Sequence, residues 1–464
     1  MDIQFYGAAR EVTGSCHVVQ VNGRTIVLDC GLFQGRRADV SKKNSSLPAA
    51  VRAADAVILS HAHIDHAGRL PFLVREGYKG PIHVTAATRD LSEVMLADAA
   101  HIQEKDAEFL ARRNRAAVAP LYAQRDVERT IGLMQPQRYD QSFPVLPGIT
   151  ATFVDAGHIL GSASVILDVV NGNESRRLVF SGDIGRVGLP IIRDPHPPEL
   201  ANVVIMESTY GNRDHPATNG GKEALARVIR ETAARGGRVL IPAFAVGRTQ
   251  ELVYDLHELT RDRAIPEVPI YIDSPLATKA TDVFSRNTAI FDAAEPFIHE
   301  QSAKLTELFR FPQLRYTETV EESKQLDTQA GPSVIIAASG MAESGRILHH
   351  LLHGASDPRN TILVVGFMAE HTLGRRIVDR APVLKVFGDD VPLRANVEVI
   401  SGYSAHGDRR ELRTWIDAVR ARSPALHDVY LVHGEVAAQD AFSAALSSGG
   451  YRVHCPEAGA RVTW

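Results

Sequence analysis

The segment Ser60-His61-Ala62-His63-Ile64-Asp65-His66 comes directly after a short apolar run, AVIL at residues 56–59. Such a run is typical of a buried strand, and the segment would then form the loop at the carboxyl end of that strand. Imidazole and carboxylate groups together favour Zn²⁺, with Mn²⁺ or iron as competing ions. A solvated histidine-rich loop is the alternative, but four ligand-type side chains at one strand end favour a metal site.

Other ligand-type side chains follow short β-branched runs elsewhere in the chain, and one loop alone cannot enclose two metal ions. They are Asp29, His158, Asp183, Glu207, His406 and His433. Each one alone is more typical of a helix cap or of a hydrogen-bonded polar residue. Together they form a row at the carboxyl ends of predicted strands, where α/β enzymes place their sites. Six or seven such ligands are enough for two open-sided metal sites.

The composition is that of an ordinary globular protein. The chain has 464 residues, of which 44% are hydrophobic and 23% charged, and this length suits two or three domains. A formal net charge of −4 gives no global basic field of the kind that non-specific DNA coats carry. No apolar run approaches the roughly 18 residues of a membrane span, and the N-terminal residues do not resemble a secretion signal. We therefore expect a cytoplasmic protein with no membrane partner.

The pattern of predicted elements changes along the chain. Residues 1–208 consist mainly of short β-branched runs and turns, with predicted strands such as residues 82–85 and 203–207. Residues 209–396 alternate strands with helices, which is typical of parallel βαβ units. Strands return after residue 397, with one helix predicted at residues 409–420. These patterns predict two α/β parts, but they do not decide whether the second is inserted into the first or follows it.

The ligand-type residues occur in an order that resembles a known family. Asp29, His61-x-His63-x-Asp65-His66, His158 and Asp183 resemble the four motifs of the metallo-β-lactamase superfamily. The later residues resemble motifs A, B and C of its β-CASP nuclease branch, with Glu207 as A, His406 in SAHGD as B and His433 in LVHGE as C. The segments IPAFAVGRTQEL at 241–252 and SGMAESGR at 339–346 are also similar to that branch. The resemblance covers essentially the whole chain and is strongest to bacterial RNA-processing members.

The resemblance implies an α/β fold with a particular domain arrangement. Residues 1–208 and 397–464 would form a four-layer αββα metallo-β-lactamase core. Residues 209–396 would form a β-CASP domain that is inserted between these two parts. This expectation resolves the choice between an inserted and an appended domain that the patterns left open.

The resemblance also implies roles for the ligand-type residues. One Zn²⁺ would be bound by His61, His63 and His158, the other by Asp65, His66 and His433, and Asp183 would bridge the two. Mn²⁺ stays an alternative metal. Among the catalytic residues, Asp65 would position a metal-bound hydroxide and Asp29 would orient a ligand histidine. His406 would donate a proton to the leaving 3′-oxygen, and Glu207 would hold and polarise His406.

Two strand–turn–helix passages are candidate contacts for RNA phosphates. Ser339, Gly340 and Met341 lie in a small-residue turn before a predicted helix, where backbone N–H groups can bind an anion. Arg248 lies in a second such passage and could bind another phosphate. A surface Arg without a ligand is an equally good interpretation of that position.

These expectations together predict a zinc-dependent ribonuclease that acts on single-stranded RNA in RNA processing or decay. Cleavage would be endonucleolytic, with 5′-exonuclease activity and homodimer formation left open. The alternatives are a lactonase- or thioesterase-type hydrolase, a DNA nuclease and a non-catalytic scaffold. The long insertion argues against a small substrate, and the full ligand set argues against a scaffold. In the resembled branch, histidine at motif C accompanies RNA and valine accompanies DNA, so His433 favours RNA.

Overall fold

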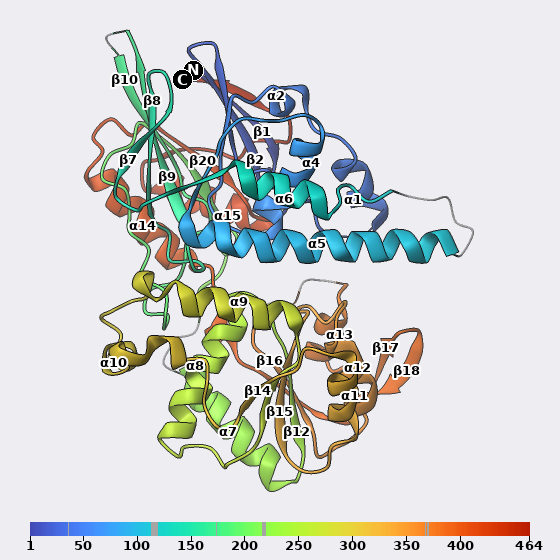
Figure 1. Cartoon of the computed structure of the whole chain (residues 1–464). Coiled ribbons are helices and arrows are strands. Elements are labelled where there is room, and N and C mark those ends of the chain that lie inside the picture. The colour runs from blue at the N-terminus through green and yellow to red at the C-terminus, as the bar shows by residue number, and fades with distance from the viewer. Residues whose placement is uncertain (36, 113–118, 173, 216–219, 367, 369–370) are drawn as a thin grey trace. The chain divides into compact units, whose positions relative to one another are not determined.

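The computed structural model describes the chain except for residues 36, 113–118, 173, 216–219, 367 and 369–370 (Figure 1). The chain divides into two compact units. The first consists of Met1–Val187, Asp194–Asp214 and His406–Trp464, and the second of Gly188–Arg193 and His215–Ala405. The chain enters the larger part of the second unit after Asp214 and leaves it after Ala405, whereas the sequence predicts boundaries at 208 and 396. The short segment Gly188–Arg193 joins the second unit, which no sequence pattern indicated.

The first unit contains two seven-stranded sheets. The first sheet has the order β22 (Arg461–Thr463), β1 (Asp2–Gly7), β2 (Cys16–Val21), β3 (Arg24–Leu28), β4 (Ala56–Ile58), β5 (Ile82–Thr85) and β6 (Met134–Gln137). The second has the order β21 (Arg452–His454), β20 (Asp428–Val432), β11 (Val203–Glu207), β10 (Glu174–Phe180), β9 (Ala163–Asn171), β8 (Ile149–Asp155) and β7 (Ser142–Leu146). In the first sheet the neighbouring strands from β3 to β6 are parallel, and in the second sheet those from β10 to β21 are parallel. The other neighbouring strands of both sheets are antiparallel.

Hydrophobic side chains separate these elements into four layers. Alternate residues of β1, such as Ile3 and Phe5, point inward and pack with Phe153 and Phe180 of the other sheet. Helices α4 (Leu70–Arg75), α5 (Ala86–Arg112) and α6 (Gln124–Leu133) cover the outer face of the first sheet. Helices α14 (Arg409–Ala421) and α15 (Val436–Ser448) cover the second sheet. The four-layer αββα prediction is confirmed, and α1 (Arg37–Asn44), α2 (Ala49–Arg52) and α3 (Ile64–Ala67) complete the helices of this unit.

The start of α14 shows how local sequence positions a site loop. Asp408 is the N-cap, and its carboxylate accepts hydrogen bonds from the N–H groups of Arg410 and Glu411. The Glu411 carboxylate in turn accepts the N–H of Asp408 at 2.8 Å, which completes a capping box. Removing such a cap costs about 1 kcal/mol. The cap therefore fixes the backbone two residues after His406.

The second unit is built around a parallel six-stranded sheet. Its order is β14 (Leu314–Tyr316), β13 (Ile270–Ile272), β15 (Ser333–Ala337), β12 (Arg238–Pro242), β16 (Thr361–Val364) and β19 (Asn396–Val399). Its helices include α7 (Gly221–Ala234), α8 (Arg248–Arg261), α9 (Pro275–Arg286), α10 (Pro296–Glu300), α11 (Val320–Thr328), α12 (Ile347–Gly354) and α13 (Leu373–Val378). A hairpin of β17 (Val383–Val386) and β18 (Asp389–Pro392) lies apart from the sheet. This βαβ organisation is the one that the pattern of residues 209–396 predicts.

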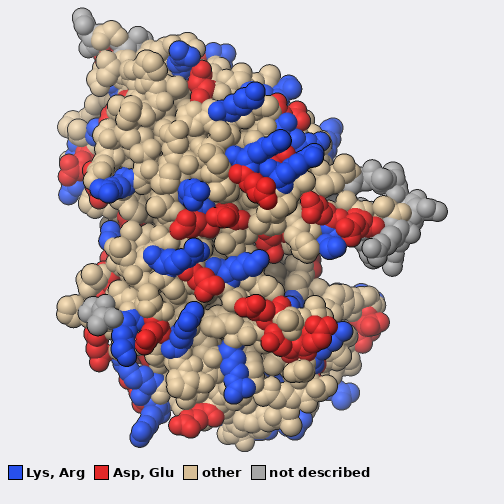
Figure 2. Space-filling view, viewed as in Figure 1, with Lys and Arg blue, Asp and Glu red and all other residues tan. Residues whose placement is uncertain are grey.

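The surface carries charges of both signs. Figure 2 shows Lys and Arg side chains interspersed with Asp and Glu side chains over the face in view. None of the described helices has the length and hydropathy of a membrane span.

Candidate metal centre

The predicted ligands of the first unit lie at carboxyl ends of strands in both sheets. His61 and His63 follow β4, and His158 follows β8. Asp183 follows β10, and His433 follows β20. Asp65 and His66 lie in α3, whose backbone approaches the β3 loop closely, since a Cβ on Gly31 would lie 1.6 Å from the Asp65 carbonyl oxygen. The glycine at position 31 therefore allows the contact that holds α3 in place.

One group of ligand atoms consists of three histidines and an aspartate. His61, His63, His158 and Asp183 offer atoms that all lie within 4.8 Å of one another. The Nδ1 atom of His63 lies 3.1 Å from Nε2 of His61 and 3.2 Å from Nε2 of His158. Burial lowers the pKa of His63 to about 4 and that of His61 well below its usual range. Both rings are therefore neutral at pH 7, which is the form of imidazole that binds metals.

A second group lies beside the first and shares a contact with it. Asp65, His66 and His433 offer atoms that also lie within 4.8 Å of one another. The Nε2 atoms of His66 and His433 are 3.1 Å apart, and His433 Nε2 lies 3.5 Å from the Asp65 carboxylate. Oδ2 of Asp183 lies 3.3 Å from His66 Nε2 and 3.5 Å from the Nε2 atoms of His61 and His158. Asp183 is thus placed between the two groups.

The donor set fits two divalent cations. Oδ1 of Asp183 is buried and has no hydrogen-bond partner among the residues that the structure describes. A buried carboxylate oxygen without a partner is costly unless a cation neutralises it. The nitrogen and oxygen donors are those that Zn²⁺ and its competitors prefer. The donor chemistry of these groups therefore suits the binding of metal ions.

Hydrogen bonds behind the ligands hold their rings in place. Asp29 Oδ2 lies 2.7 Å from Nδ1 of His66, so that Nε2 of that ring faces the other ligands. Asp29 also accepts hydrogen bonds from the backbone N–H and hydroxyl of Ser60, at 2.8 and 3.0 Å. Two hydroxyls that sequence reasoning missed have similar positions, since Ser60 Oγ lies 3.1 Å from Nδ1 of His61 and Thr209 Oγ1 lies 3.1 Å from Nδ1 of His433. Ser and Thr beside strand ends are too common to signal such a role.

His406 and Glu207 form a pair next to the ligand groups. His406 Nδ1 lies 3.2 Å from the Glu207 carboxylate and 3.9 Å from Asp183. Glu207 is fully buried and accepts the N–H of Ile184 at 2.6 Å, whereas the His406 side chain is 21% exposed. Burial alone would lower the pKa of His406, but the charge and hydrogen bond of Glu207 outweigh it and raise this pKa to about 9. The structure thus places the His406 imidazole beside the proposed metal site, where Glu207 favours its charged form.

Comparisons with known proteins identify related domains along most of the chain. It matches the Metallo-beta-lactamase superfamily over residues 9–242, the Beta-Casp domain over 249–377 and the Zn-dependent metallo-hydrolase RNA specificity domain over 390–456. It is 39% identical to Ribonuclease TTHA0252 of Thermus thermophilus over 435 residues, which cover 94% of this chain and 93% of that protein. The chain belongs to the β-CASP branch of the metallo-β-lactamase superfamily.

Archaeal relatives and a solved structure extend this comparison. The β-CASP chain is 33% identical to Transcription termination factor FttA of Methanocaldococcus jannaschii, over 93% of this chain and 67% of that protein. It thus spans about two thirds of the length of such archaeal relatives. A crystal structure of a protein of unknown function from Enterococcus faecalis V583 covers 100% of this chain and 99% of its own, with a TM-score of 0.55. Their sequence identity is 12%, so this likeness shows the fold alone.

The predicted RNA contacts lie in the second unit, which contains the Beta-Casp match and is called the β-CASP unit below. Residues 339–341 lie in the turn between β15 and α12, where Ser339 Oγ accepts N–H groups of Glu343 and Ser344 at 3.2 and 3.3 Å. Arg248 is largely buried, donates to the Val365 carbonyl and lies 3.6 Å from Glu251. The alternative of a surface Arg is wrong, because this side chain is held inside the unit by these contacts. The contact of Arg248 with RNA stays a prediction.

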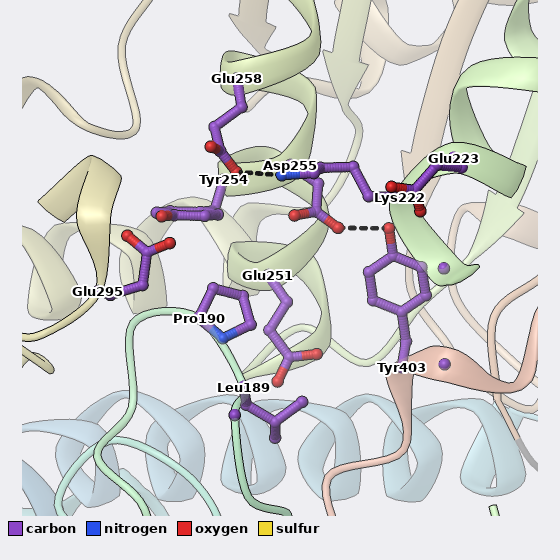
Figure 3. Close-up of a pocket in the computed structure, with 13 residues that line it drawn as sticks. Leu189, Pro190, Lys222, Glu223, Glu251, Tyr254, Asp255, Glu258, Glu295 and Tyr403 are labelled. Carbon is purple, nitrogen blue, oxygen red and sulfur yellow. Dashed lines mark hydrogen bonds and ion pairs between the residues drawn. The ribbon is translucent and has the colours of Figure 1, made fainter. Parts of the chain in front are cut away.

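The β-CASP unit also contains an acidic pocket of about 400 Å³ (Figure 3). Its carboxylates belong to Glu223, Glu251, Asp255, Glu258 and Glu295. Lys222 pairs with Glu258 at 3.0 Å, and the hydroxyl of Tyr403 donates to Asp255 at 2.6 Å. An excess of carboxylates repels phosphate, so the charge of this pocket disfavours binding of the RNA backbone.

Replacing Asp255 by asparagine should stabilise the protein at alkaline pH but not at acid pH. Burial raises the pKa of Asp255 from 3.8 to about 7, so the folded state keeps a proton that the unfolded state releases between these pH values. The free energy of unfolding therefore falls as pH rises through this window, by up to ~4 kcal/mol. Thermal unfolding at pH 4 and pH 8 checks this, with the exposed Asp390→Asn as control. Equal effects of Asp255→Asn at both pH values would contradict it.

Proposed function

We propose that this β-CASP protein is a ribonuclease that hydrolyses single-stranded RNA in the cytoplasm with two zinc ions. The arrangement that carries the proposal is the pair of ligand groups sharing Asp183, with His406 and Glu207 beside them. The ions would be held by His61, His63 and His158, by Asp65, His66 and His433, and by Asp183 between them. Zinc ions in such a pair supply Lewis acidity to a phosphate oxygen and lower the pKa of water.

The residues around the ions have separate tasks in this proposal. Asp29, through Nδ1 of His66, keeps that ring in the orientation in which Nε2 can bind. His406 donates its proton to the 3′-oxygen that leaves when the phosphodiester bond breaks. Glu207 keeps His406 protonated and holds its ring at 3.2 Å. Without this proton the leaving alkoxide would have to depart as a strong base.

Several observations support RNA as the substrate. Relatives that cover almost the whole chain are named a ribonuclease and transcription termination factors. The resemblance also supports RNA, because histidine at motif C, as His433 here, accompanies RNA in the resembled branch. The turn at residues 339–341 offers a phosphate contact in the β-CASP unit. We propose internal cleavage as the main activity, with 5′-exonuclease activity as an additional mode.

Product analysis tests this proposal. The purified, zinc-loaded protein is incubated with end-labelled single-stranded RNA, single-stranded DNA, duplexes, a lactone and a thioester. We expect RNA to be cleaved at internal sites, with duplexes and small substrates left intact. Preferential cleavage of DNA would replace the proposed substrate, and hydrolysis of only the lactone or thioester would overturn the nuclease proposal.

A further inference from the structure

Phe244 is an exposed aromatic residue at the carboxyl edge of the β-CASP sheet. It lies between β12 and α8, and 47% of its surface is exposed. Its carbonyl accepts hydrogen bonds from the Thr249 hydroxyl at 2.7 Å and the Thr249 N–H at 3.3 Å. The preceding Ala243 N–H donates to the Ala337 carbonyl at 3.1 Å. The backbone around Phe244 is therefore fixed, although its ring is not covered by the core.

The Phe244 ring packs against the proposed phosphate turn. A Cβ atom on Gly340 would lie 2.7 Å from Cδ2 and 2.9 Å from Cγ and Cε2 of Phe244. The ring thus lies directly over the Gly340 backbone, in the space that the side chain of any other residue at position 340 would occupy. Strands β12 and β15 are parallel neighbours that pair Pro242 with Ala337, so both turns leave the sheet at the same edge. An exposed ring and the proposed phosphate-binding turn are therefore side by side.

This combination matches the chemistry of a single-stranded nucleotide. Proteins bind single strands by contacting phosphates and by stacking exposed bases on aromatic side chains. A ring that served only the core would be covered, as Phe284 and Phe309 of the same unit are. Binding a base gives a reason for the exposure of Phe244 that packing does not give. The ring accepts any base, because every base has a π-face.

We propose that Phe244 is the stacking platform for an RNA base next to the phosphate that residues 339–341 bind. This inference rests on the proposed ribonuclease function, and it adds a residue for binding and positioning the RNA. Phe244 belongs to the β-CASP unit and the proposed metal ligands belong to the first unit, so its loss should weaken RNA binding without removing zinc.

Fluorescent RNA tests the stacking directly. 2-Aminopurine, whose fluorescence is quenched by stacking, is placed at successive positions of a single-stranded RNA bound to zinc-loaded Asp65→Asn protein. We expect strong quenching at one position, its loss in Phe244→Leu and its retention in Phe244→Tyr. Phe387→Leu is the matched control, because Phe387 is 58% exposed in the same unit, at the hairpin of β17 and β18. That variant should behave like the parent.

An abasic substitution supplies an independent measurement. Removing the base at the quenched position should weaken RNA binding to the protein that keeps Phe244 by about 5- to 100-fold. The Phe244→Ala variant should bind the abasic RNA and the intact RNA equally well. Unchanged quenching in Phe244→Leu, or an abasic penalty that persists in Phe244→Ala, would overturn the inference while leaving the ribonuclease function intact. Wild-type protein that neither binds nor cleaves RNA would overturn both.

Discussion

Asp65→Asn should lower the rate of RNA cleavage by orders of magnitude while RNA affinity stays nearly unchanged. Oδ2 of Asp65 lies 3.5 Å from Nε2 of His433, within the second ligand group. Asparagine keeps the shape of the side chain, but its neutral amide is a weaker metal ligand and positions an attacking water less well. Single-turnover rates and equilibrium binding of the same RNA separate the two effects.

The exposed Asp440, which pairs with Arg10 on the surface, supplies a matched control. Asp440→Asn should match the wild type in both rate and affinity. A collapse of affinity in Asp65→Asn, with an unchanged rate per bound complex, would make Asp65 a binding residue instead.

His406→Ala should lower the cleavage rate by about 10²–10⁴ and leave the zinc content unchanged. His406 pairs with Glu207 and belongs to neither of the two sets proposed to hold zinc. Its ring does lie with Glu207 and Asp183 in a third group of ligand-type atoms within 4.8 Å of one another, so the zinc measurement also decides whether His406 is a ligand. A substrate with sulfur in place of the leaving 3′-oxygen needs little protonation, so it should recover much of the lost rate. Cleavage of the oxygen- and sulfur-linked substrates by wild type and variant measures this rescue.

A structural role for His406 makes a different prediction. His406 forms a β-bridge with Gly185, and the Gly407 N–H donates to the Ile184 carbonyl at 2.8 Å. If His406 only holds this loop, the variant should lose the same factor on both substrates. Glu207→Gln serves as a companion, because it should slow the oxygen substrate more than the sulfur substrate. If each variant lost the same factor on the oxygen-linked and the sulfur-linked substrate, proton donation by His406 would be contradicted.

The fold class could be predicted because its signals are local. The predicted strands at residues 82–85 and 203–207 match the bounds of β5 and β11. Most motif residues are also local signals, since Asp29 and His433 directly follow strands and Glu207 ends one. His406 is an exception, because it follows the turn at residues 401–403 and not a strand. The structure brings Asp29, His66 and His433 together from distant parts of the chain, and their proposed roles stay predictions.

Other features depend on contacts between distant segments and left no local signal. Gly188–Arg193 belongs to the β-CASP unit, although residues 194–214 of the first unit separate it in sequence from the rest of that unit. One of its contacts there is the hydrogen bond from the Asp292 N–H to the Ile191 carbonyl, at 2.8 Å. The burial of Arg248 depends on the Val365 carbonyl, 117 residues further along the chain. The exposure of Phe244 contradicts its apolar character, so no periodicity could predict it.

Zinc content and RNA cleavage, measured on one preparation before and after chelation, test the two-metal ribonuclease most directly. The wild type should contain about two zinc ions per chain, lose cleavage when they are removed and recover it when zinc is restored. His63→Ala and Asp183→Ala should lose zinc and activity but keep most of the fold, because the hydrophobic layers do not include the metal ligands. Wild-type protein that is free of metal and still cleaves RNA would contradict the proposed function.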